Sequence, residues 1–120
     1  MARYEEFSID KGSDISIKLE LTEKNGTKKD LSSHTLKGRI KRNYADSAGE
    51  ATNFYTRIPP GTAADGVCYL ELTNTQTKAL RSGRHVFDAE INWTGLAGNK
   101  IKERVLEGTI NITPSVLDSA

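Results

Sequence analysis

The amino-acid sequence predicts an all-β fold in which two antiparallel sheets pack face to face. Two observations support this prediction: segments of alternating apolar and polar residues recur along the chain, and turn residues separate them at intervals of about ten residues. Side chains of a strand alternate between its two faces, so a strand with one buried face produces this alternation. About seven short strands are expected, and a small closed barrel is the alternative that periodicity leaves open.

Length and composition agree with one β-sandwich domain over residues 1–120. A chain of 120 residues can bury one hydrophobic core, and 36% hydrophobic residues in a patterned sequence exclude a disordered segment. Lys and Arg number 17 against 16 Asp and Glu, so no overall field draws the chain to nucleic acid or an anionic membrane. The amino terminus lacks the apolar stretch of a signal peptide or a membrane span.

Residues 15–22 give the clearest strand, because their alternation is almost strict. Further strands are expected at residues 4–9, 35–41, 52–58, 67–72, 85–93 and 101–112, with turns at 25–26, 46–49, 59–61 and 95–99. The inward rows are Ile15, Ile17, Leu19, Leu21, Leu36, Gly38, Ile40, Thr52, Phe54, Thr56, Ile58, Cys68, Leu70, Leu72, His85, Phe87, Ala89, Ile91, Trp93, Leu106, Gly108, Ile110 and Ile112. The alternation slips between Ile101 and Val105, which indicates a β-bulge.

One segment has the pattern of a helix instead of a strand. Thr73 and Gln76 have the spacing of a capping box, and apolar residues then recur at helical intervals. A short helical turn is expected near residues 74–81, crossing one end of the sandwich, with Gly83 as its stop.

The residues that most often carry chemistry are few and scattered. His34 and His85 fall in different strands with no metal-ligand spacing around them, and Cys68, the single cysteine, is expected to be buried and inert. An internal disulfide is therefore excluded, and no nucleophile elbow or phosphate-binding loop is present. We expect no enzyme activity, no catalytic residues, no cofactor, no metal and no small-molecule substrate.

Five aspartates stand beside predicted turns: Asp10, Asp14, Asp30, Asp46 and Asp65. Aspartate at a turn usually accepts hydrogen bonds from nearby backbone amides, and the ligand pattern of a calcium loop is missing. We expect these carboxylates to shape turns.

A candidate interaction surface combines five residues: Lys37, Arg39, Lys41, Tyr55 and Tyr69. The three cations alternate along one strand and so project to one side, where they could follow a phosphate backbone. Lysines on a solvated strand also discourage edge-to-edge aggregation, and this second interpretation is preferred. Tyrosine is enriched at protein interfaces, which favours Tyr4, Tyr44, Tyr55 and Tyr69 as contact residues.

Several segments together resemble a known group of proteins. They are the opening residues 7–19, residues 30–40, Leu70 to Thr73, the entry Gly83-Arg84 to a long strand, and the closing residues 104–114. Over residues 7–114 the chain resembles the small immunoglobulin-like virion structural proteins of tailed phages, and it is similar to the amino-terminal domain of phage baseplate upper proteins. The resemblance implies an immunoglobulin-like sandwich, although the paired cysteines of true immunoglobulin domains are missing.

The resemblance implies function only by association. It implies a non-enzymatic virion protein, made in the host cytoplasm, that joins or decorates tail, baseplate or neck components through protein–protein contacts. The implied partners are other virion proteins in a symmetric, multi-copy assembly, without membrane or nucleic acid. The alternatives are a capsid decoration protein and a host-surface or carbohydrate-binding module, and an enzyme ranks last.

Overall fold

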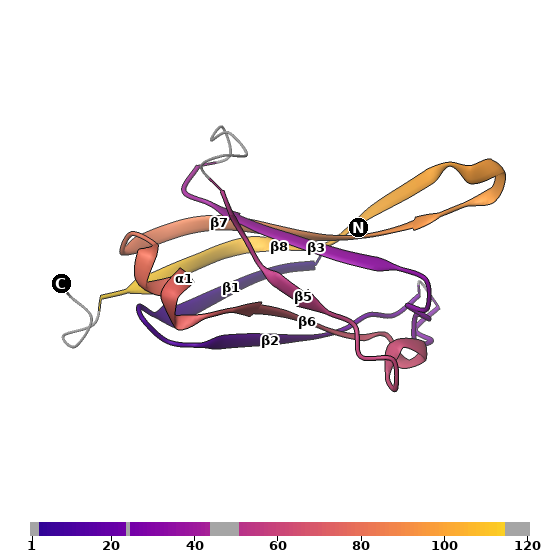
Figure 1. Ribbon diagram of the computed structural model, residues 1–120, viewed down its shortest axis with the longest axis horizontal. Helices are drawn as coiled ribbons and strands as arrows, with labels where there is room; N and C mark the ends of the chain where they lie inside the picture. The colour runs from indigo at the N-terminus through magenta and orange to yellow at the C-terminus, as the bar shows by residue number, and fades with distance from the viewer. Residues whose placement is uncertain (1–2, 24, 44–50, 115–120) are drawn as a thin grey trace.

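The computed structural model describes residues 3–23, 25–43 and 51–114, which form two packed sheets (Figure 1). The elements are β1 (Arg3–Asp10), β2 (Ile15–Glu20), β3 (Thr35–Lys41), β4 (Thr52–Asn53), β5 (Tyr55–Arg57), η2 (Ala63–Asp65), β6 (Val67–Leu72), α1 (Asn74–Ala79), β7 (Gly83–Thr94), η3 (Leu96–Gly98) and β8 (Lys100–Thr113). One sheet has the order β1-β8-β7-β3-β4, and the other has the order β2-β6-β5. The predicted turn at 46–49 and Tyr44 lie outside the described residues.

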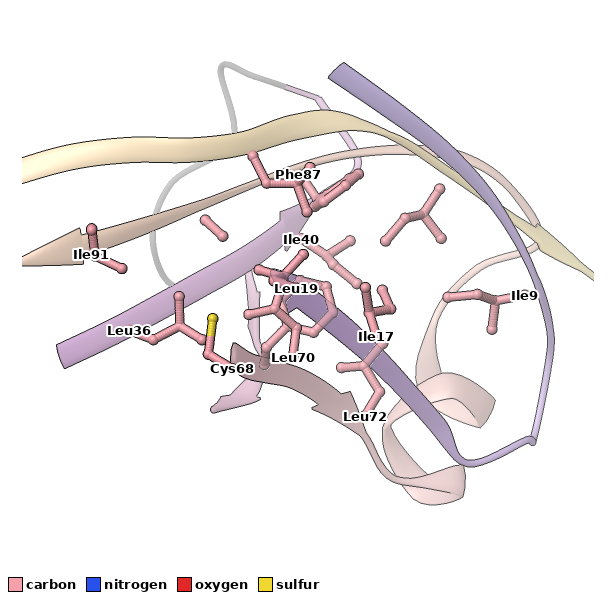
Figure 2. Packing of buried hydrophobic residues seen from close by; sticks show 14 of the residues in the cluster. Ile9, Ile17, Leu19, Leu36, Ile40, Cys68, Leu70, Leu72, Phe87 and Ile91 are labelled. Carbon is pink, nitrogen blue, oxygen red and sulfur yellow. The ribbon is translucent and has the colours of Figure 1, made fainter. Parts of the chain in front are cut away.

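The inner faces of the two sheets share one hydrophobic core. On β2 and β6 the predicted inward residues Ile17, Leu19, Cys68, Leu70 and Leu72 are all buried in it, and Val67 at the start of β6 is buried as well. Their side chains face those of β3 and β7 across the sandwich (Figure 2). Each large aliphatic side chain that is removed from water contributes roughly 1.5–3 kcal/mol, so these rows hold the sheets together.

The core is narrow at β3, where Gly38 lies between larger inward residues. A Cβ atom built on Gly38 would lie 2.9 Å from both Leu70 Cδ2 and Phe54 Cδ2. The ring of Phe54 fills this space and packs edge-on against Phe87, with 6.3 Å between ring centroids. The missing side chain of Gly38 therefore makes room for Phe54.

The predicted strand at residues 52–58 is divided between the two sheets. Its first part, β4, pairs with β3, while its second part, β5, pairs with β6. Phe54 is buried at the crossing. Thr56 is opposite the buried Leu70 and so lies on the inward face, as predicted, but it is exposed because β5 is an edge strand. Period-two alternation therefore continues across the crossing, but it does not show that the chain changes sheets there.

Strand β1 pairs with β8 in parallel, which the prediction of purely antiparallel sheets did not include. The pairing is continuous from Arg3 opposite Leu106 to Asp10 opposite Thr113. At Gly108 the β1 backbone comes so close that an added Cβ atom would clash with the carbonyl oxygen of Glu5. Glycine at this position is what allows the two backbones to pair.

Helix α1 begins with the capping box that the sequence predicts. The Thr73 hydroxyl accepts a hydrogen bond from the Gln76 amide, and the Gln76 side chain accepts one from the Thr73 amide. The helix ends at Ala79, and Gly83, with φ of 111°, opens β7 instead of stopping the helix.

Strands β7 and β8 extend beyond the sandwich as a two-stranded ribbon. Their pairing runs from Gly83 opposite Ile112 to Thr94 opposite Lys100, and its register shifts at Ala89 and Glu90, which confirms the predicted bulge. β3 pairs with β7 only as far as Asn92. We call residues 93–103 the arm, and Figure 1 shows it projecting past one end of the sandwich.

Candidate interaction surface

The basic row of β3 lies on the outer face of the five-stranded sheet, next to an acidic row of β7. In the register of the two strands, Lys37 is opposite Glu90 and Arg39 is opposite Asp88. The Arg39 guanidinium donates a hydrogen bond to the Asn53 side chain at 3.0 Å. Cross-strand neighbours of opposite charge attract each other modestly and reduce the positive potential of the row.

The third cation of the row, Lys41, is half-buried and lies opposite Val86. The three cations therefore share one face, as predicted, but acidic neighbours accompany two of them. This arrangement favours the preferred interpretation of a solvated sheet face over a track for a phosphate backbone.

Tyr55 and Tyr69 lie on the outer face of the other sheet. The Arg57 guanidinium lies over the Tyr69 ring, 4.2 Å from its centroid, and it pairs with the Glu71 carboxylate at 3.3 Å. Hydrogen bonds from the Arg57 and Ser16 side chains lower the pKa of the half-buried Glu71 carboxyl. Tyr55 pairs with Glu71 in register and is 61% exposed, so this face carries an aromatic and charged cluster.

The five residues of the predicted surface are thus split between opposite faces of the sandwich, with Lys37, Arg39 and Lys41 on one sheet and Tyr55 and Tyr69 on the other. No single flat partner can contact both groups at once. Alternation along a strand predicts which residues share a face of that strand, but it does not predict which sheet the strand joins.

The base of the arm is fixed by contacts with the β2–β3 connection, which the sequence did not predict. The His34 ring packs against Trp93, with 4.7 Å between ring centroids, and Lys29 Nζ lies 5.4 Å from the Trp93 ring centroid. Lys29 Nζ also lies 2.8 Å from a carboxylate oxygen of Glu23 and 3.8 Å from one of Glu103. Trp93 packs partly buried against the core, in agreement with its predicted inward position.

The histidines and the cysteine are held by structural contacts. His85 is buried, its Nδ1 lies 3.2 Å from the Gly83 carbonyl oxygen, and burial lowers its pKa. His34 Nδ1 lies 3.0 Å from the Ser32 carbonyl oxygen. Cys68 is completely buried, as predicted, and burial raises the pKa of its thiol to about 11. A thiol with this pKa is a poor nucleophile at neutral pH.

The described aspartates hold turns and connections. Asp14 accepts a hydrogen bond from the Asn74 amide at 2.6 Å, and Asp30 accepts one from the Ser32 amide at 2.9 Å. Hydrogen bonds from the Ser32 side chain and from the Ser32 amide lower the pKa of Asp30. Asp10 accepts a hydrogen bond from the Thr113 hydroxyl, and Asp65 pairs loosely with Lys28. Asp46 lies outside the described residues.

Residues 3–23, 25–43 and 51–114 contain neither a cluster of metal-ligating side chains nor a membrane-spanning helix. No group of three or more His, Cys, Asp or Glu side chains in these ranges could hold a metal ion. Within the same part of the chain, no helix has the length and apolar character needed to cross a membrane.

Comparisons with known proteins bear on the fold of this chain. No family model matches the sequence, and no curated protein matches it. Among solved structures, the chain is similar to the N-terminal domain of phage TP901-1 ORF48, with a TM-score of 0.57 at 12% identity over 89% of this chain and 83% of that chain.

Two further solved structures are similar at lower TM-scores. One is a chain in the complex of ICOS with ICOS-L and an anti ICOS-L VNAR domain, with a TM-score of 0.47 at 12% identity over 95% of this chain and 56% of that chain. The other is murine CRIg, with a TM-score of 0.46 at 12% identity over 92% of both chains. With its two packed sheets and one short helix, the chain is an immunoglobulin-like β-sandwich.

Proposed function

We propose that this chain is a non-enzymatic structural protein of a tailed-phage particle. It joins or decorates components of the tail, baseplate or neck through protein–protein contacts, and it occupies several symmetry-related positions there. Its partners are other virion proteins, and it takes no small-molecule substrate.

The observation that carries this proposal is the likeness to the N-terminal domain of phage TP901-1 ORF48. The likeness extends over 89% of this chain and 83% of that domain, so it is a match of whole domains and not of a shared hairpin. The sequence resemblance over residues 7–114 supports the same setting. Identity of 12% is low, and the proposal therefore concerns the kind of particle and not a particular neighbour.

The geometry supports contact as the mode of action. The arm projects from one end of the sandwich and presents strand edges that other chains can reach (Figure 1). Exposed strand edges pair readily with other chains, whereas scattered histidines and a buried thiol offer little for catalysis.

The test is to locate the chain in particles. Antibodies raised against the purified chain would be used to label particles of the phage whose genome encodes it, and the labelled particles would be viewed by electron microscopy. The expected result is label at the tail, baseplate or neck. A matched preparation from a phage in which the gene is deleted controls for non-specific label.

Each other outcome has a defined meaning. Label spread over the head shell would contradict the joining role and support capsid decoration. Absence of the chain from every particle would refute the virion assignment altogether, while leaving the immunoglobulin-like fold as it stands.

A further inference from the structure

One stretch of β8 lacks a neighbour along its outer edge. β1 fills that edge from Leu106 to Thr113, but its described residues begin at Arg3, opposite Leu106. Beyond this point residues 100–103 pair with β7 on one side, and no described strand pairs with them on the other. Their outward backbone amides and carbonyls can accept an added strand.

The side chains of this stretch have opposite characters on the two faces of the ribbon. Lys100 and Lys102 are two residues apart and therefore project from one face, opposite Thr94 and Asn92 of β7. Both lysines are exposed, and neither has an ion pair among the described residues. They place uncompensated positive charge directly beside the open edge.

The opposite face of the same stretch carries the exposed apolar Ile101 and, two residues further on, Glu103, whose carboxylate is paired with Lys29 at 3.8 Å. Ile101 is 40% exposed, although its register partner Trp93 is covered by His34 and Lys29 of the β2–β3 connection. A strand added along the edge would place alternate side chains beside Ile101 and the others beside the lysines.

We propose that residues 100–103 bind an extended, acidic segment of a neighbouring protein as an added strand. Its acidic side chains lie beside Lys100 and Lys102, and the apolar side chains between them cover Ile101. This inference deepens the proposed function and rests on it only for the identity of the neighbour, which is another virion protein.

The charges near the arm favour a polypeptide over a nucleic acid. A phosphate backbone that lay across the outer face would meet Asp88 and Glu90 of β7, next to the basic row of β3. Arg104, the next cation along β8, is already paired with Asp88 and Glu107, each at 3.6 Å. A strand along the outer edge of β8 lies on the side away from β7 and avoids this repulsion.

Lysines at a strand edge can also serve only to prevent aggregation. That role requires only that the lysines disfavour pairing with other copies of the same cationic edge. It does not predict preferential binding of an acidic strand, so the charge of a probe peptide separates the two roles.

The test is a binding titration with a labelled, capped peptide in which glutamate alternates with valine. A peptide with glutamine in place of glutamate is the neutral control, and a labelled thymidine oligonucleotide represents a phosphate backbone. The purified chain is titrated into each probe, and fluorescence anisotropy measures binding. Amide hydrogen exchange at residues 100–103, with and without peptide, reports pairing of the backbone.

The variant K100E/K102E reverses both charges of the edge. The matched control is K18E/R84E, which changes the net charge equally at exposed strand positions outside the arm. All four side chains are exposed, so thermal melts of both variants should stay near that of the parent chain.

The expected result is binding of the glutamate peptide, slower exchange at residues 100–103, and a loss of about tenfold in affinity for K100E/K102E but not for K18E/R84E. Equal loss in both variants, equal binding of the glutamine peptide, or unchanged exchange would overturn the proposal. Binding of the oligonucleotide alone would replace it with nucleic-acid binding.

The peptide assay uses no particle, so the two proposals fail separately. If the peptide binds as expected but labelling finds the chain in no particle, the virion assignment fails and the strand-binding edge remains. If labelling succeeds and the peptide does not bind, the chemistry of the partner segment is wrong.

Discussion

Replacing Thr77 with valine should destabilise the domain by breaking the connection between α1 and the β1–β2 turn. Thr77 is completely buried. Its hydroxyl donates a hydrogen bond to the Ser13 carbonyl oxygen at 2.8 Å and accepts one from the Gly12 amide at 3.1 Å. These contacts join segments more than sixty residues apart in sequence. Valine has nearly the shape of threonine, so the change removes these two hydrogen bonds, and the 3.2 Å contact of the hydroxyl with the Asn74 carbonyl oxygen, without creating a cavity.

The size of the effect follows from the Gly12 amide and the Ser13 carbonyl, which both lose their hydrogen-bond partner. A protein hydrogen bond contributes about 1 kcal/mol net, and a buried group left without a partner costs about 1–3 kcal/mol. Gly12 and Ser13 are half-buried, so water can reach them in part, and the lower values apply. The expected loss is about 2 kcal/mol in the free energy of unfolding, which corresponds to a decrease of about 8 °C in Tm for a domain of this size.

The assay is urea unfolding and thermal melting followed by circular dichroism, with Thr75→Val as the matched control. Thr75 is exposed on the same helix, and its hydroxyl makes only a long contact of 3.4 Å with the neighbouring Asn74 side chain. The control should therefore change stability by less than about 0.5 kcal/mol. Equal stability of Thr77→Val and the parent chain, or equal loss in both variants, would refute the reasoning.

Four further substitutions or treatments have defined outcomes. Leu70→Asp places an unpaired charge in a completely buried position and should abolish the cooperative thermal melt; a melt like that of the parent would show that the core is assigned wrongly. Gly108→Ala should cost about 2 kcal/mol in urea unfolding and loosen β1, seen as faster amide exchange there. Burial lowers the pKa of His85 in the folded chain below the ordinary value of 6.5, which the unfolded chain keeps. As the pH falls below 6.5 the unfolded chain therefore binds a proton at His85 before the folded chain does, and the free energy of unfolding should decrease. His85→Gln should reduce this decrease, and unchanged pH dependence would contradict the argument. The Cys68 thiol should resist Ellman's reagent until urea unfolds the chain, whereas rapid reaction in native buffer would disagree with its burial.

The sequence predicts a strand well where the alternation of apolar and polar residues alone decides which side chains are buried. On β2 and β6 each inward residue is apolar and packs in the same core, so alternation is sufficient to identify these residues. The capping box of Thr73 and the bulge near Val105 are likewise local in sequence and were predicted from local spacing.

Neighbours across the sheets could not be predicted in this way. The parallel pairing of β1 with β8 depends on the glycine at 108 and on residues a hundred positions apart. The crossing at Phe54 depends on the space above Gly38, which no local pattern reveals. Period two identifies the faces of a strand, whereas the partner of a strand is decided by the packing of the whole chain.

For the same reason, the sequence could not show that the predicted interaction residues lie on different sheets. Lys37 and Tyr55 each have the composition of contact residues, but the topology places them on different sheets. The arm depends on the length of β7 and β8 beyond their neighbours, and this becomes visible only when the register is known.

The parallel pairing of β1 with β8 also determines how the domain responds to force. β1 starts near the base of the arm, while β8 finishes at the opposite end of the sandwich, near α1 (Figure 1). Tension applied at Arg3 and Thr113 pulls the two strands past each other along their length. The whole ladder between them is then loaded in shear at one time, whereas an antiparallel pair of terminal strands would be peeled apart one bond after another. A domain connected in this way holds its shape under a pull along its long axis.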